Sequence, residues 1–329
     1  MRPVIMFALV VAMVAAVVAA QDKAPAPATA PAEETVSIRS TKDGTMEPAI
    51  FYCPEEAKPG GKKAAPLLVG LHTWSSDYKQ NMGYFGECRK RGWVLIAPNF
   101  RGINNRPEAC ASELAIQDVL DAVEYARKNA NVDENRIYLT GWSGGGHMAM
   151  MMAAKAPKLW AGVSVWVGIS DLAKWHEQVG KGSGYARNMD VICGGAPGEA
   201  KADPQYRARS PLWVLEQAKD LPFDINAGVR DGTVPFIQSI WAFNALAKAN
   251  GHTGEALTDE QIQTMTRTKA VPAELVKEWK AEPRRRSAIL FRREAGAARL
   301  TLFDGGHEMD VNVALDWLAG QSKHKAGMN

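Results

Sequence analysis

Short apolar runs alternate along the chain with longer segments in which apolar residues recur at helical spacing. Several of the short runs, such as residues 67–71, are continuously apolar, which is typical of strands buried on both faces of a sheet. The predicted strands are residues 49–53, 67–71, 93–97, 136–140, 162–167, 223–227, 288–291 and 299–303. The predicted helices are residues 78–91, 112–129, 144–156, 235–249 and 311–318. The alternation predicts an α/β fold in which helices flank a mostly parallel central sheet.

Residues 251–286 interrupt this alternation. They contain two polar helical patterns, at residues 259–268 and 273–280, and Val271 and Pro272 separate the two. Because proline cannot continue a helix from the preceding residue, we predict a small helical hairpin inserted on the rim of the sheet. The sequence leaves open whether this insertion moves as a lid.

The first 20 residues have the pattern of a secretory signal peptide. Arg2 precedes an uncharged apolar stretch at residues 4–20, and the stretch ends with Val18 and Ala20 placed for a small-x-small cleavage site. A membrane anchor is the alternative, because 17 apolar residues are just enough to span a bilayer. We therefore expect a secreted or periplasmic protein that is not stably inserted in a membrane after cleavage.

The next segment, residues 21–34, is rich in proline and alanine and lacks aromatic and large aliphatic residues. Such a composition cannot form a core and is typical of a linker. We expect one folded domain, at residues 35–322. Composition supports a sizeable core, since 46% of the 329 residues are hydrophobic.

Charge is nearly balanced over the chain. There are 39 Lys and Arg residues against 36 Asp and Glu residues, which leaves a formal net charge of +3. This excess is too small for a broad nucleic-acid-binding surface. The run of three arginines at residues 284–286 is short and has no aromatic residues among it, so we interpret it as a solvated face.

The four cysteines are Cys53, Cys88, Cys110 and Cys193, and export would allow them to form disulfides. Three pairings are open and the sequence does not choose among them. Cys88 lies one helical turn from Phe85 and is predicted to be a buried thiol, while Cys110 and Cys193 lie in loop sequence where a bridge and free thiols both stay open. The cysteine spacing offers no zinc motif, and we expect neither a metal nor a cofactor.

The strongest candidate for chemistry is Gly-Trp-Ser-Gly-Gly at residues 141–145, which follows the strand at residues 136–140 and precedes a helix. On such a strand–turn–helix, Ser143 projects its hydroxyl from the sheet, and the flanking glycines let neighbouring backbones approach closely. The N-terminus of the following helix directs unpaired N–H groups at negative charge near the serine. Ser143 is therefore the predicted nucleophile, and the Gly144 amide one oxyanion donor.

A serine nucleophile needs an imidazole base, and the imidazole needs a carboxylate that fixes its tautomer. His307 lies in the loop after the strand at residues 299–303, and Asp231 lies in the loop after an earlier strand. Both loops leave the carboxyl end of a strand, as the serine does. Asp224 competes with Asp231, but it is inside a strand, and Asp304 is close in sequence to His307.

The remaining histidines are interpreted as structural or exposed. His72 shapes the loop after its strand, His147 packs within the helix after the serine, and surface or insertion contexts are expected for His176, His252 and His324. None of them is predicted to be the base.

The second oxyanion donor is expected in the loop after residues 67–71. The Trp74 amide is our prediction and the Thr73 amide the alternative. Trp74, Trp142 and Trp175 are also predicted near the serine, where an indole face suits a sugar ring or a phenolic acyl group. For Trp142 and Trp175, filling the core beneath these loops is an equal alternative.

Residues 66–318 resemble the α/β-hydrolase superfamily and, within it, the catalytic domain of the prolyl oligopeptidase family and its small secreted esterase relatives. The resemblance rests on ordered matches: the loop at His72, Ala-Pro-Asn-Phe-Arg-Gly at 97–102, residues 129–137, the motif at 141–145, Ser210-Pro211, the loop at Asp231 and Gly306-His307. It implies an α/β-hydrolase fold and a serine hydrolase with a Ser143–Asp231–His307 triad and no cofactor. Two departures are Thr73, where the family has glycine after the histidine, and the family's propeller, which this sequence does not include.

We therefore predict an exported serine hydrolase that cleaves carboxylic esters, of acyl or feruloyl type, on polysaccharides. Without a propeller, no chamber selects short peptides, and an open site favours an ester. A serine peptidase is the first alternative, because the triad chemistry serves both bonds. A binding protein that keeps the fold without catalysis is the second. The predicted partner is the ester substrate, with no nucleic acid, and the oligomeric state is open.

Overall fold

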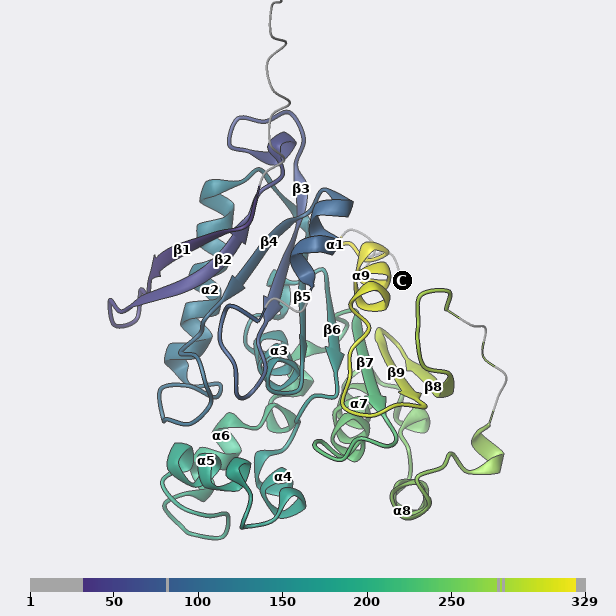
Figure 1. Cartoon of the computed structure of the whole chain (residues 1–329). Helices are drawn as coiled ribbons and strands as arrows, with labels where there is room; N and C mark the ends of the chain where they lie inside the picture. Colours follow the sequence, from purple (N-terminus) through teal and green to yellow (C-terminus); the bar gives the residue numbers. More distant parts are fainter. Residues whose placement is uncertain (1–31, 81–82, 277–278, 280–281, 324–329) are drawn as a thin grey trace, which may run out of the picture. The chain divides into compact units, whose positions relative to one another are not determined.

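A mixed sheet of nine strands runs through the described part of the chain, which comprises residues 32–80, 83–276, 279 and 282–323 of a computed structural model (Figure 1). The strands are β1 (Glu34–Arg39), β2 (Met46–Tyr52), β3 (Ala65–Leu71), β4 (Val94–Pro98), β5 (Val132–Trp142), β6 (Gly162–Trp166), β7 (Phe223–Gly228), β8 (Ile289–Ala295) and β9 (Ala298–Phe303). Their order is β1-β2-β4-β3-β5-β6-β7-β9-β8. The six central strands, β4-β3-β5-β6-β7-β9, are parallel to one another. Strands β1 and β2 at one side and β8 at the other pair antiparallel.

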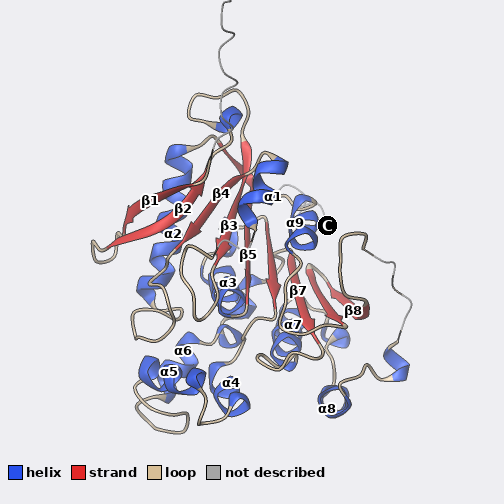
Figure 2. Cartoon of the chain, viewed as in Figure 1, coloured by secondary structure: helices blue, strands red, loops and turns tan. Residues whose placement is uncertain are grey.

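Helices cover both faces of this sheet (Figure 2). The longer ones are α1 (Tyr84–Arg91), α2 (Glu113–Asn129), α3 (Gly144–Lys155), α7 (Ile237–Ala249), α8 (Asp259–Thr268) and α9 (Val311–Ala319). In β3, Leu67 and Val69 belong to a core shared with α2, α3 and α7, while Leu68 belongs to a second core with α1 and α9. Alternate side chains thus enter opposite layers, which explains why the central strands are continuously apolar.

A third hydrophobic cluster lies beyond the carboxyl ends of the strands, under three short helices. These are α4 (Leu172–Val179), α5 (Gly184–Cys193) and α6 (Asp203–Arg209), and Asp171 and Ser183 cap the first two by accepting backbone N–H groups. The cluster includes Trp74 from the loop after β3 and Ile169 from the loop after β6. These three helices were not predicted from the sequence.

The predicted α/β sheet and its flanking helices are confirmed, with element ends displaced by up to six residues. Strand β1 was not predicted. It is an edge strand with Ile38 as its single buried residue, so it has little apolar pattern. In the insertion, α8 has the predicted bounds and a capping box formed by Thr258 and Gln261. The second predicted helix, at residues 273–280, does not begin as an α-helix. Residues 273–275 form one 3-10 turn, and residues 277–278 and 280–281 lie outside the described residues.

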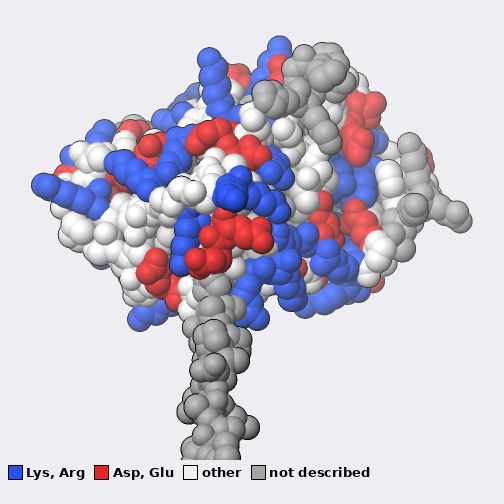
Figure 3. All heavy atoms as spheres, turned by 90° about the horizontal axis from the view of Figure 1, so that it is seen from above, with Lys and Arg blue, Asp and Glu red and all other residues white. Residues whose placement is uncertain are grey.

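The charged groups are mixed rather than segregated on the face shown in Figure 3, where Lys and Arg side chains lie among Asp and Glu side chains. In the run at residues 284–286, Arg284 and Arg286 are exposed, as predicted for a solvated face, but Arg285 is not. The Arg285 side chain is 2% exposed, packs on the Trp166 ring and pairs with Glu282, because it bridges the sheet to the insertion. Within the described residues, no helix is long and apolar enough to cross a bilayer. The predicted signal peptide and nearly all of the linker lie outside them.

Candidate active site

The turn from β5 to α3 presents Ser143 in a strained backbone conformation. Its φ of 55° and ψ of −123° lie outside the regions that L-residues favour, at a cost of about 1–3 kcal/mol. Backbone contacts hold the turn: the Ser143 N–H donates to the Trp166 carbonyl at 2.9 Å, and a Cβ on Gly141 would lie 2.4 Å from the Gly145 carbonyl oxygen. A larger residue than glycine cannot occupy position 141 without moving the turn. The fold therefore holds Ser143 where the sequence predicted.

Two backbone amides meet beside this serine. A Cβ on Gly144 would lie only 2.4 Å from the Trp74 backbone nitrogen, so the start of α3 and the loop after β3 are in direct contact. The Gly144 amide is in the first turn of α3, where no intrahelical acceptor exists. The Thr73 amide, the alternative donor, is already bonded to Gln80 Oε1 at 2.9 Å, whereas the Trp74 amide has no acceptor within the described residues. Gln80 was not identified from the sequence, which carries no signal for this contact.

His72 braces the loop that carries Trp74. Its Nδ1 lies 2.9 Å from the Thr73 carbonyl oxygen and its Nε2 2.6 Å from the Asn99 carbonyl oxygen, while the ring stacks on Phe100 at 3.9 Å. Burial lowers the pKa of His72. The His72 side chain thus links the loop after β3 to the loop after β4 and supports the loop that carries Trp74.

Asp231 and His307 are hydrogen-bonded across two loops. Asp231 Oδ2 lies 2.7 Å from His307 Nδ1, and Oδ1 accepts the N–H groups of Thr233 at 2.7 Å and Val234 at 2.9 Å. The Asp231 carboxylate is fully buried, and the His307 side chain is 23% exposed. The carboxylate is therefore held in place and orients the imidazole of His307. The Nε2 atom of this imidazole makes no hydrogen bond to the described residues.

Backbone contacts also bring these two loops together. Strand β7 ends at Gly228, and a Cβ there would lie 2.3 Å from the Gly306 carbonyl oxygen. The Arg230 N–H donates to the Gly305 carbonyl at 2.9 Å. The loops are thus held against each other one to three residues from Asp231 and His307, which accounts for their register.

The two competing carboxylates have other partners. Asp224 is buried within β7 and pairs with Arg299 at 2.8 Å, and it accepts the Ser164 hydroxyl at 3.0 Å. Asp304 pairs with Arg230 at the surface. Neither of these carboxylates contacts the imidazole, so their geometry favours Asp231 as the orienting group.

The three tryptophans divide into one beside the site and two beneath it. Trp142 is half-buried and lies 5.3 Å from the His307 ring. Trp74 is 1% exposed and packs edge-to-face on Trp175, which is fully buried and donates its indole N–H to the Thr233 carbonyl at 3.0 Å. This burial revises the prediction that the rings of Trp74 and Trp175 face a substrate: they support the loops from the core.

The other buried histidines are structural. His147 Nε2 lies 2.7 Å from the Arg209 carbonyl oxygen, and burial lowers the pKa of His147 to about 4. His176 was expected near the surface, but it is 2% exposed and pairs with Asp190 at 2.9 Å, because α4, the helix that carries it, packs against α5 and α6. His252 is exposed, and His324 lies outside the described residues.

All four cysteines are free thiols. Cys88, Cys110 and Cys193 are buried, and burial raises the pKa of Cys193 to about 12. Cys110 and Cys193 belong to the same hydrophobic cluster, without the bridge that the sequence left open. Over the described residues, no group of three or more His, Cys, Asp and Glu side chains is arranged to hold a metal ion.

Comparison with known proteins places this geometry in context. The model of the prolyl oligopeptidase family matches residues 77–266. The chain is 28% identical to a poly(3-hydroxybutyrate) depolymerase of Ralstonia pickettii, over 42% of this chain and 32% of that one. It is 30% identical to an acetylxylan esterase of Coprinopsis cinerea, over 42% and 39%, and 31% identical to an uncharacterized peptidase of Bacillus subtilis, over 37% and 46%. The chain thus spans less than half the length of these relatives.

Solved structures share the fold. An acylaminoacyl peptidase of Pyrococcus horikoshii superposes with a TM-score of 0.53 at 19% identity, covering 68% of this chain and 36% of that one. A thermostable esterase gives 0.51 at 18% identity, covering 88% and 63%. At these identities the likeness establishes an α/β-hydrolase fold and leaves the reaction to be argued from the site.

Proposed function

The chain belongs to the prolyl oligopeptidase family, and from this premise we propose that it is a serine hydrolase that cleaves carboxylic esters with a Ser143–His307–Asp231 triad. The observation that carries the proposal is the 2.7 Å contact between His307 and the buried Asp231 carboxylate, at the edge of the sheet where β5 ends in the strained Ser143 turn. The same arrangement of nucleophile, base and orienting acid recurs in serine hydrolases of unrelated fold.

In this mechanism His307 Nε2 takes the Ser143 proton as the hydroxyl oxygen attacks the ester carbonyl. Asp231 holds the proton on Nδ1 and stabilises the imidazolium that forms. The amides of Gly144 and Trp74 donate to the oxyanion of the tetrahedral intermediate. When that intermediate collapses, His307 protonates the departing alcohol and an acyl-enzyme remains. Water, deprotonated by His307, then releases the carboxylic acid and restores the serine.

Two similarities support an ester rather than a peptide as the substrate. The chain resembles a protein named as a depolymerase of poly(3-hydroxybutyrate), which is a polyester, and one named as an acetylxylan esterase. We therefore propose acyl groups on a polysaccharide as the substrate class. The second candidate is peptide hydrolysis, which the resemblance to a peptidase of Bacillus subtilis favours.

We also propose that the protein is exported. The support is the apolar stretch at residues 4–20 with its small-residue end, followed by a proline- and alanine-rich segment. Expression with and without residues 1–20 tests this: we expect the mature protein outside the inner membrane, beginning near residue 21, only when the segment is present. Retention of the full-length chain in the membrane would indicate an anchor instead.

The reaction is tested with p-nitrophenyl acetate and a peptide p-nitroanilide, each with the protein lacking residues 1–20. Ser143→Ala is the catalytic variant, and Ser37→Ala, at an exposed serine of β1, is the matched control. We expect ester turnover that is lost in Ser143→Ala, kept in Ser37→Ala, and accompanied by little anilide cleavage. Comparable anilide cleavage would identify a peptidase. If neither substrate is cleaved and a serine-directed phosphonate fails to label Ser143, the protein is catalytically silent.

A further inference from the structure

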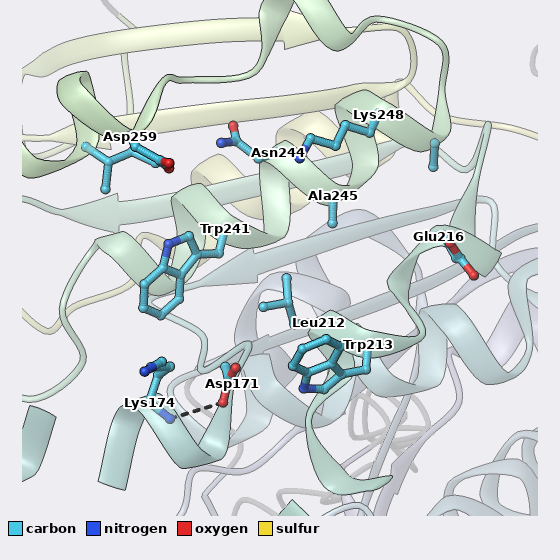
Figure 4. A pocket seen from close by; sticks show the side chains of 12 residues that line it. Asp171, Lys174, Leu212, Trp213, Glu216, Trp241, Asn244, Ala245, Lys248 and Asp259 are labelled. Carbon is cyan, nitrogen blue, oxygen red and sulfur yellow. Dashed lines mark hydrogen bonds between the residues drawn. The ribbon is translucent and has the colours of Figure 1, made fainter. Parts of the chain in front are cut away.

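A groove of about 770 Å³ lies along α7 (Figure 4). Its walls are α4, the 3-10 turns at residues 211–218, α7 and α8, and neither Ser143, Asp231 nor His307 lines it. Pockets of this volume are typical of small-molecule or oligomer binding. The groove is therefore large enough to hold a ligand.

Two indoles from different elements line the groove. Trp213 is 49% exposed, which is unusual for so large an apolar side chain, and the Arg207 guanidinium covers one face of its ring at 4.1 Å. Trp241 reaches in from α7, and Figure 4 shows both rings beside Leu212. The stacked guanidinium restrains the Trp213 ring, so its remaining surface forms a fixed flat wall.

Charges of both signs surround these rings. The side chains of Glu216, Lys248 and Asp259 are exposed, and none of them makes a hydrogen bond or an ion pair within the described residues. Asp171 is engaged at the N-cap of α4, and Lys174 is paired with Glu177 at 3.2 Å. The groove thus offers unpaired acceptors and an unpaired donor, without a field of one sign.

We propose that this groove binds a segment of a neutral polysaccharide. A sugar ring presents a face of C–H groups that packs on an indole, and its hydroxyls both donate to carboxylates and accept from an ammonium group. Because carboxylates and ammonium groups are mixed in the groove, it has no field of one sign that would select a polyanion or a polycation. An extended peptide is a poorer fit, because the walls are helices and 3-10 turns whose backbone groups are not free to pair with a strand.

The groove is also placed to serve the proposed reaction. Helix α7 begins at Ile237, directly after the loop that carries Asp231, and α4 begins after the loop that follows β6. Both helices start at the carboxyl edge of the sheet, so a polymer held along α7 leads toward the edge where Ser143 lies. This part of the inference rests on the proposed function, whereas glycan binding itself does not.

Affinity electrophoresis in native gels tests the binding. The probes are arabinoxylan, glucomannan and hydroxyethyl cellulose, which are neutral, and polygalacturonate, which is anionic. We expect at least one neutral polysaccharide to retard the protein, and Trp213→Ala and Trp241→Ala to weaken that retardation about tenfold, the effect of losing one aromatic contact. Val191→Ala, at an exposed apolar residue of α5, is the matched control and keeps the affinity. Thermal unfolding of each variant checks that it is folded.

Two results would overturn the inference. One is that none of the three neutral polysaccharides retards the protein, whether or not polygalacturonate does. The other is equal retardation of wild type and both folded tryptophan variants, which would place glycan binding elsewhere. Hydrolysis of p-nitrophenyl acetate by the same samples separates this from the proposed reaction: an active enzyme without retardation rejects the groove alone, and retardation without hydrolysis rejects the reaction alone.

Discussion

At the Ser143 turn, the backbone of α3 packs directly on the backbone of the loop after β3, whereas the groove along α7 is lined by the side chains of helices and 3-10 turns. A Cβ on Gly145 would lie 2.5 Å from the Leu71 carbonyl oxygen, and one on Gly144 2.4 Å from the Trp74 nitrogen. In the groove, by contrast, Trp213 is half exposed and Lys248 has no partner within the described residues. The first region depends on close packing, the second on replaceable surface groups.

This difference indicates how each region responds to substitution. Packed backbone has few alternative arrangements, so an added methyl group must shift whole loops. An exposed side chain on a helix is truncated with local effects only. We therefore expect hydrolysis of small esters to depend steeply on the first region and to be insensitive to the second.

The largest expected effect comes from Asp231→Asn. The amide donates where the carboxylate accepts, which favours the wrong tautomer of His307, and kcat/KM for p-nitrophenyl acetate should fall about 10⁴-fold. Asp304→Asn, at the surface carboxylate paired with Arg230, is the matched control and should stay within about twofold of wild type. A loss of less than about tenfold in Asp231→Asn would reject the triad assignment.

Gly144→Ala should reduce kcat about 100-fold, the cost of losing one oxyanion donor, because the new Cβ pushes the Trp74 amide away. Steady-state kinetics with the same ester measures the loss. Gly86→Ala is the control: this glycine is within α1 with nothing near its Cβ position, so that variant should be fully active and slightly more stable. Wild-type activity in Gly144→Ala would show that the two backbones separate freely, so that this region does not depend on close packing.

Buried His147 should make the folded protein sensitive to acid. Its folded pKa is about 4 against 6.5 for the free side chain, so between these values the unfolded state binds a proton that the folded state does not. The free energy of unfolding should therefore fall by about 3 kcal/mol through this group as the pH drops from about 6.5 to 4. His72, whose pKa is also lowered, adds a loss of the same sign.

Urea unfolding at several pH values measures this acid sensitivity. His147→Asn should show a shallower decline of stability with falling pH, although its stability at neutral pH is lower. His252→Asn, at an exposed histidine, should keep the wild-type slope. An unchanged slope in His147→Asn would mean that this histidine is protonated or solvated in the folded state.

The smallest expected effect is that of Trp213→Ala on a small ester. The ring is exposed and belongs to none of the three hydrophobic clusters, so kcat/KM for p-nitrophenyl acetate should change by less than about twofold. A large loss on this substrate would mean that the groove and the Ser143 turn are coupled.

Local chemistry determined much of this protein from its sequence. Strand–turn–helix patterning with Gly-Trp-Ser-Gly-Gly identified Ser143 as a candidate, and strand ends followed by loops identified Asp231 and His307. The buried strands were predictable for the same reason, since a sheet covered on both faces requires continuous apolar runs. These features depend on residues within about ten positions of each other, and the handedness and order of βαβ units then bring the loops to one edge.

Only the tertiary structure decided what depends on distant residues. Gln80 occupies the Thr73 amide and leaves that of Trp74 without an acceptor among the described residues. Trp175 belongs to the core rather than to the site, because α4, the helix that carries it, packs against α5. The groove is built from segments up to 91 residues apart, between Asp171 and Ile262. Side-chain exposure is a property of packing between segments, and no local pattern contains it.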